Sequence, residues 1–113
     1  MAVYVSNLVI NTGVTFQQTF SLENISSNDA LDLNGFTAMS QMRKHAGSTG
    51  IAATFTASIQ NADNGQVQVG LSRVTTASLK PGRYVYDVIV SDSVGEVTRV
   101  VEGSVLVRQG VTR

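Results

Sequence analysis

A single histidine is available in this chain for acid–base chemistry. A nucleophilic serine or threonine needs a neighbouring base, which is most often histidine. His45 stands in a small, polar stretch that continues to Ser48 and Thr49, and the sequence offers no third residue that would orient it. This pattern predicts a solvated loop rather than a nucleophilic site.

Acidic residues offer a second kind of chemistry. Glu23, Asp29 and Asp32 lie in one polar stretch and could contact Ca²⁺, but they lack the spacing of an EF-hand loop. The run Asp63-Asn64-Gly65 is explained as a hairpin turn, because Asn and Gly tolerate positive φ angles. We therefore expect no bound metal and no cofactor.

Paired carboxylates for glycoside hydrolysis would have to come from Asp87, Glu96 and Glu102. Asp87 and Glu102 are expected on neighbouring strands, where ion pairs with arginine are the usual arrangement. The candidate partners are Arg83, Arg99 and Arg108. No catalytic residue is assigned, and we expect a protein that is not an enzyme.

The composition narrows the class of protein further. The 113 residues are enough for one domain, expected to span residues 1–113, and the absence of cysteine excludes disulfides and thiolate metal sites. The net charge is zero, so the basic excess of a nucleic-acid-binding protein is missing. No apolar run is long enough to cross a membrane, and the first residues lack the pattern of a signal peptide. We expect neither nucleic acid nor membrane as a partner.

Short runs rich in Val, Ile, Thr and Phe are separated by Gly, Asn, Asp and Ser, which is typical of strands. Expected strands cover residues 3–10, 14–22, 36–44, 53–59, 67–71, 84–90 and 97–107, and residues 75–79 are expected to form one helical turn. This pattern predicts an all-β immunoglobulin-like sandwich of about seven antiparallel strands. A small barrel is the alternative.

The last third of the chain contains the clearest local pattern. Leu79, Pro81 and Gly82 form a corner before Tyr84, whose hydroxyl is expected to bond back to upstream backbone as in a tyrosine corner. An ordinary strand tyrosine is the alternative. In the final strand, alternation predicts that one face holds Val97, Arg99, Val101, Gly103, Val105 and Val107.

The same region carries a family resemblance. The block from Leu79 to Val88, the block from Gly95 to Val107 and the closing Val111-Thr112-Arg113 resemble small structural proteins of tailed bacteriophages. The N-terminal half adds further residues of the pattern: Val9, Ile10, Gly13, Phe16, Phe20, Leu22, Leu31, Leu33, Gly35, Phe36, Thr37, Ala38 and Arg43. The chain is similar to the immunoglobulin-like N-terminal domain of phage upper baseplate proteins and to free-standing virion proteins of this length.

The resemblance implies a non-enzymatic virion protein, located in the virion after assembly in the host cytoplasm. It favours a capsid decoration, or cement, protein bound to the major capsid protein and forming a homo-oligomer within the particle. A tail, neck or baseplate subunit or fibre adaptor is the alternative. A carbohydrate- or cell-surface-binding module is a further alternative, against which the lack of tryptophan counts. The two chain ends are the predicted interface, with residues Ala2, Val3, Tyr4, Val5, Val111, Thr112 and Arg113.

Overall fold

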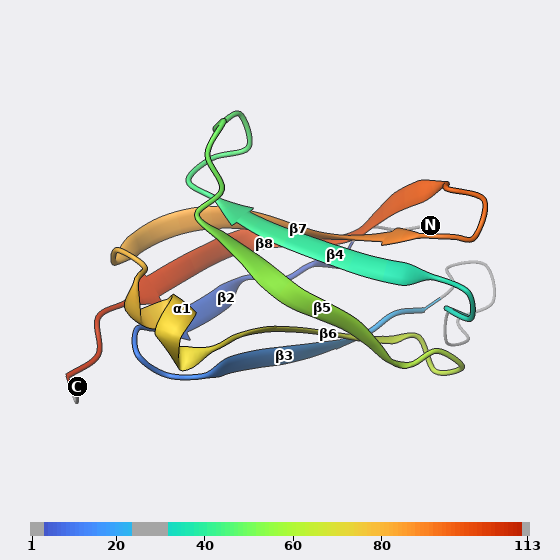
Figure 1. Cartoon of the computed structure of the whole chain (residues 1–113), viewed down its shortest axis with the longest axis horizontal. Helices are drawn as coiled ribbons and strands as arrows, with labels where there is room; N and C mark the ends of the chain where they lie inside the picture. The colour runs from blue at the N-terminus through green and yellow to red at the C-terminus, as the bar shows by residue number, and fades with distance from the viewer. Residues whose placement is uncertain (1–3, 24–31, 112–113) are drawn as a thin grey trace.

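A computed structural model describes residues 4–23 and 32–111, and Figure 1 shows their arrangement. The strands of this part of the chain are β1 (Tyr4–Val5), β2 (Leu8–Asn11), β3 (Phe16–Ser21), β4 (Thr37–Arg43), β5 (Ala53–Asn61), β6 (Gln66–Leu71), β7 (Gly82–Ser91) and β8 (Val97–Arg108). One short helix, α1 (Arg73–Ala77), lies between β6 and β7. Most of the described chain is strand, so the all-β prediction is confirmed at this level.

The strands form one path in the order β1-β8-β7-β4-β5-β6-β3, and β2 pairs with β8 next to β1. Most pairs are antiparallel, but β1 and β2 run parallel to β8. The prediction of only antiparallel strands is therefore wrong, and the described part of the chain contains eight strands rather than about seven.

The extra strand arises because the expected first strand is interrupted at Ser6 and Asn7. The hydroxyl of Tyr86 donates to the carbonyl oxygen of Ser6 at 2.6 Å, and the side-chain oxygen of Asn7 accepts from the Ser104 amide at 3.1 Å. Gly103 lies against this break, and a Cβ added there would overlap the Ser6 carbonyl. The carbonyl and amide of Ser6 are thus satisfied by β7 and β8, because its amide also donates to the Glu102 carbonyl oxygen.

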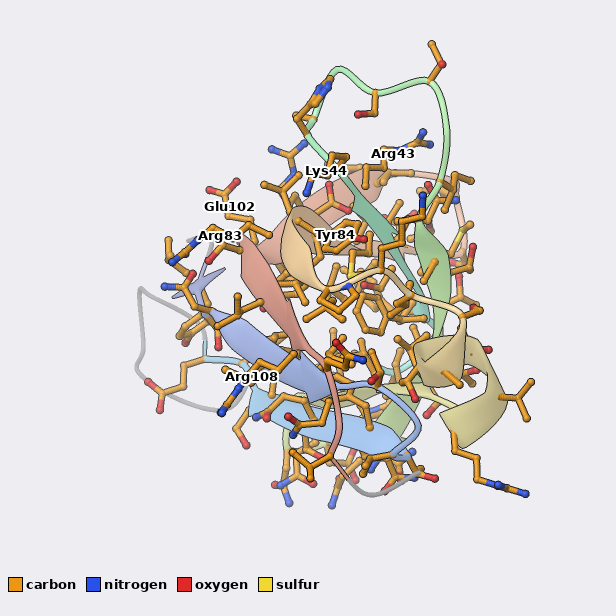
Figure 2. All side chains as sticks on the ribbon, turned by 90° about the vertical axis from the view of Figure 1, so that its left-hand side faces the viewer. Arg43, Lys44, Arg83, Tyr84, Glu102 and Arg108 are labelled. Atoms are coloured by element: carbon orange, nitrogen blue, oxygen red, sulfur yellow. The ribbon has the colours of Figure 1, made fainter. Side chains whose placement is uncertain are left out.

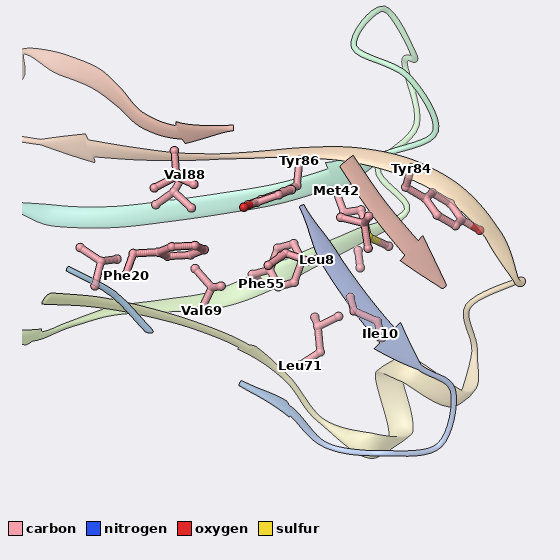
Figure 3. Close-up of a cluster of buried hydrophobic side chains, with 14 of the residues drawn as sticks. Leu8, Ile10, Phe20, Met42, Phe55, Val69, Leu71, Tyr84, Tyr86 and Val88 are labelled. Atoms are coloured by element: carbon pink, nitrogen blue, oxygen red, sulfur yellow. The ribbon is translucent and has the colours of Figure 1, made fainter. Parts of the chain in front are cut away.

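The sheet curls over a single core because β5 changes partners along its length. Residues Ala53 to Phe55 pair with β4, whereas Thr56 to Asn61 pair with β6. As a result β3 and β6 lie across the core from β4, β7 and β8 (Figure 1). Figure 3 shows the buried side chains between the two layers, where the ring of Phe55 contacts that of Tyr86 with centroids 6.0 Å apart.

Alternation predicts the inward faces of the central strands well. Val67, Val69 and Leu71 of β6 are buried, as are Tyr84, Tyr86, Val88 and Val90 of β7. Burial of such side chains contributes about 25 cal/mol for each Å² of apolar surface removed from water.

The helical turn predicted over residues 75–79 begins earlier, at Arg73, because Ser72 caps it. The Ser72 hydroxyl oxygen accepts from the Thr75 amide at 3.2 Å, which satisfies a free N–H at the helix start. Among the described residues, no helix has the length and apolarity needed to cross a membrane.

Candidate functional site

The outer face of β4, β7 and β8 contains a shallow groove of about 460 Å³. Its polar lining comes from Gln41, Arg43, Asp87, Arg99 and Glu102, and its apolar lining comes mainly from Val5, Ala46 and Val85. Strand register explains why these groups meet. Asp87 lies between Gln41 on β4 and Glu102 on β8, so the three side chains form one row across the sheet.

A β-bulge brings Arg99 to the same face. The register of β7 with β8 shifts between Val88, which pairs with Val101, and Ile89, which pairs with Arg99. Val100 is the extra residue, and both Val100 and Val101 are buried. A bulge of this kind changes the face on which the preceding residues lie. The predicted single face from Val97 to Val107 is therefore wrong, because Arg99 and Val97 point outward.

Arg99 is the centre of a small charge cluster. Its Nε lies 3.2 Å from a carboxylate oxygen of Asp87, and its Nη1 lies 3.8 Å from one of Glu102. The expected pairing of the two carboxylates with arginine is thus confirmed. The three side chains are 55%, 37% and 47% exposed, so water screens these ion pairs and they add little to stability. Exposed groups of this kind can exchange a mutual contact for a contact with a ligand.

Arg43 fixes one wall of the groove. Its Nη1 donates to the carbonyl oxygens of Ser48 and Thr49 at 3.0 and 3.2 Å, and its Nη2 donates to the Gln41 side-chain oxygen at 3.1 Å. The loop that contributes Ala46 is thereby tied to the end of β4. Figure 2 shows Arg43 at the base of this loop and Glu102 on the outer side of the sheet.

The apolar part of the groove depends on the parallel pairing of β1 with β8. Val5 pairs with Glu102 and is 74% exposed. The Tyr86 hydroxyl, which holds Ser6, lies against the core, and burial raises its pKa to about 12 although the hydrogen bond to Ser6 opposes this shift. Tyr86 thus remains neutral and keeps donating at all physiological pH values.

The predicted interface residues are only partly described. Ala2, Val3, Thr112 and Arg113 lie outside the described residues. Tyr4 and Val5 form β1, and the Tyr4 hydroxyl accepts from the Glu23 amide at 3.0 Å. Val111 is 95% exposed. Of this set, the structure brings only Val5 to the groove.

The corner residues lie together at the start of β7. The Tyr84 hydroxyl donates to the carbonyl oxygen of Lys80 at 2.7 Å, across Pro81 and Gly82. Leu79 is buried, and the Lys44 ammonium lies 4.7 Å from the centre of the Tyr84 ring, within range of a cation–π contact. These groups stabilise the corner and lie outside the groove.

The other residues considered for chemistry have structural partners. His45 is exposed in the loop after β4, and its backbone amide donates to the Ser48 hydroxyl at 3.2 Å. Asp32 accepts from the backbone and side chain of Asn34, which lowers its pKa. The Asn34 amide also donates to Asp63 at 2.7 Å. Asp29 lies outside the described residues, and the remainder contain no group of three or more possible metal ligands.

Comparison with known proteins gives fold neighbours but no family. No family model and no curated protein matches this chain. A GspB Siglec domain is 16% identical with a TM-score of 0.54, covering 92% of this chain and 54% of its own. An arginine-to-glutamate mutant of the SrpA adhesin from Streptococcus sanguinis is 13% identical with a TM-score of 0.51, covering 96% of this chain and 56% of its own. The chain spans about half the length of these structures, and the likeness concerns the fold alone.

These findings overturn the bacteriophage resemblance. The similar structures are a Siglec domain and an adhesin, not virion proteins. The decoration, tail, neck and baseplate roles, the capsid partners, the oligomer within a particle and the virion location are therefore wrong. The physical reason is that alternating valines and a Pro-Gly corner report how a sheet is built. Many unrelated binding proteins share that architecture.

Sequence reasoning missed most of the groove. The sequence predicts that Asp87 and Glu102 pair with Arg83, Arg99 or Arg108, but it assigns no role in a groove to Gln41, Arg43 or Val85. Their outward alternation on β4 and β7 was the available signal, since residues two apart share a face. The pairing of β4 with β7 could not be read from spacing.

Proposed function

We propose that this chain is a carbohydrate- or cell-surface-binding module that binds a saccharide in the groove over β4, β7 and β8. The observation that carries the proposal is the row of Gln41, Asp87 and Glu102 beside the Arg99 guanidinium, on an exposed sheet face. The likeness in fold to a Siglec domain and to an adhesin supports it.

The chemistry of the lining suits a saccharide. Sugar hydroxyls both donate and accept hydrogen bonds, so they need both kinds of partner. Arg99 supplies donors, Asp87 and Glu102 supply acceptors, and the side-chain amide of Gln41 carries both kinds of group. Val85 and Val5 provide an apolar surface for the C–H groups of a sugar ring. A concave site with a few convergent polar groups is the usual form of a ligand pocket.

The same comparison supports a finer description of the fold. We infer an immunoglobulin-like sandwich that forms a single domain over residues 1–113. The Tyr84 hydroxyl bonded to Lys80 has the geometry of a tyrosine corner, a feature of such sandwiches. The change of partners along β5 divides the strands into two layers, as a sandwich requires.

A non-enzymatic role at a cell surface completes the proposal. The two fold neighbours are described as a Siglec domain and an adhesin rather than as enzymes. In the groove, the carboxylates of Asp87 and Glu102 both lie beside the Arg99 guanidinium, as in an exposed ion-pair cluster.

A printed glycan array tests the proposal with fluorescently labelled full chain. Wild-type protein is expected to bind a defined subset of glycans. The Arg99→Gln variant should weaken this binding by about tenfold or more, because the guanidinium donors are lost. Arg108→Gln is the matched control, since Arg108 is also exposed on β8 but lies outside the groove. Absence of any bound glycan, or equal loss in both variants, would contradict the proposal.

A further inference from the structure

The outer face formed by β3, β5 and β6 lies on the other side of the molecule from the groove. The strands of this face carry no ionisable side chain. None of the residues in these three strands is Asp, Glu, Lys, Arg or His. The outward side chains are instead hydroxyls and amides. Gln17, Gly70 and Thr56 form one row across this face, and Thr19, Gln68 and Ser58 form the next row.

This face is hollowed where Gly70 replaces a side chain. A Cβ added at Gly70 would lie 2.9 Å from the carbonyl oxygen of Phe16, so the close approach of β3 favours glycine here. The gap between its neighbours forms a hollow of about 250 Å³. We name this the neutral hollow, and its polar lining comes from Thr15, Gln17, Thr56, Ser58, Gln68 and Ser72.

Several of these side chains are available for a ligand. Within the described part of the chain, the side chains of Thr15, Gln17 and Thr56 make no hydrogen bond to another protein group. Gln68 makes only a long contact of 3.5 Å to the Thr19 hydroxyl. These groups each carry a donor and an acceptor, and uncharged groups cost far less to desolvate than ionised ones.

We propose that the neutral hollow binds an uncharged saccharide. It is a second site, separate from the groove over β4, β7 and β8, which we call the charged groove. Sugar hydroxyls match the paired donors and acceptors of Thr, Ser and Gln. A charged ligand would find no ionised partner on the three strands, so charge complementarity favours a neutral one. The site is on the other layer of the sheet from Asp87 and Arg99, and it shares no lining residue with the groove that contains them.

The test is a titration of the ¹⁵N-labelled full chain with lactose and, separately, maltotriose, followed by amide chemical shifts. We expect saturable shifts of the Gly70 backbone amide and of the side-chain amides of Gln17 and Gln68. The double variant Gln17→Met/Thr56→Val keeps the size of the side chains and removes their hydrogen bonds, and it should bind about tenfold more weakly or worse.

Thr54→Val is the matched control, because Thr54 is exposed on the same strand but does not line the hollow. Its affinity should stay within roughly twofold of wild type. No saturable shift with either sugar, or unchanged affinity in the double variant, would overturn the proposal. Shifts of these amides with protein concentration alone would overturn it in favour of a second copy of the chain. Shifts confined to the Gln41 side-chain amide would overturn it while leaving the charged groove as the binding site.

Discussion

The two outer faces of this molecule are built from the same kind of strand but carry opposite chemistry. The face of β4, β7 and β8 gathers Arg43, Asp87, Arg99 and Glu102 around an apolar strip. The face of β3, β5 and β6 carries only uncharged groups outward. The difference shows that the fold provides two platforms, and that the outward positions of the strands decide what each platform can bind.

Each face also depends on a bulge or a glycine within its strands. The charged groove needs the bulge at Val100, which brings Arg99 beside Glu102, and it needs Gly103, against which the Ser6 carbonyl packs. The neutral hollow needs Gly70. A bulge redirects side chains, and a glycine leaves space or allows close approach of another backbone, so both can shape a site on a sheet.

The largest expected effect on stability is at the contact between Ser6 and Gly103, which supports the charged face. In Gly103→Ala, the new methyl group would overlap the Ser6 carbonyl, so Ser6 and the hydrogen bond from its amide to the Glu102 carbonyl oxygen must move. We expect the free energy of unfolding to fall by roughly 3 kcal/mol or more, measured by urea denaturation. Gly50→Ala is the control, because a Cβ there meets no atom within 4 Å. Equal stability of the two variants would show that Ser6 does not pack tightly against Gly103.

A smaller effect on stability is expected at the Tyr86 hydroxyl, which bonds to the same Ser6 carbonyl. The pKa of Tyr86 is raised to about 12 in the folded protein, above the usual tyrosine value of 10.0. Between these two pH values the folded state binds more protons than the unfolded state, so stability is fully present below pH 10 and falls as pH rises. The free energy of unfolding lost between pH 10 and pH 12 is roughly 2 kcal/mol.

Unfolding of wild type and Tyr86→Phe across pH 8 to 12 measures the contribution. The variant should be less stable by roughly 1–2 kcal/mol at pH 8, because the Ser6 carbonyl loses its partner. The difference should shrink toward pH 12. A difference independent of pH would mean that the Tyr86 hydroxyl is not buried against the core.

The smallest expected effects are changes in stability, and their dependence on salt concentration should differ between the two faces. Arg99→Gln should lower stability by less than about 1 kcal/mol, since its ion pairs are exposed. This loss should fade at high salt, because exposed charges are screened. Thr56→Val on the neutral face should change stability by no more than about 0.5 kcal/mol at any salt concentration. Thermal unfolding at low and high sodium chloride compares them, and a salt-dependent change in Thr56→Val would break the distinction.

The sequence allowed the central strands to be predicted because their alternation is regular, as in Val67 to Leu71 and Tyr84 to Val90. It could not show that β1 and β2 run parallel to β8, since that pairing joins the two ends of the chain. Alternation also misplaced Arg99, because two adjacent buried valines are compatible with either register. For the site, the neighbouring positions of Asp87 and Glu102 followed from two consecutive strands. Gln41 and Arg43 reach the groove because β4 pairs with β7, which is distant in the sequence, so their place in the site could not be predicted.

One measurement tests the central claim most directly: a printed glycan array probed with wild type, Arg99→Gln and the double variant Gln17→Met/Thr56→Val. We predict that wild type binds, that Arg99→Gln loses one set of glycans, and that the double variant loses a different, uncharged set. Binding by wild type that survives in both variants would contradict the assignment of binding to these two faces. Absence of binding by wild type would contradict the proposed carbohydrate-binding function itself.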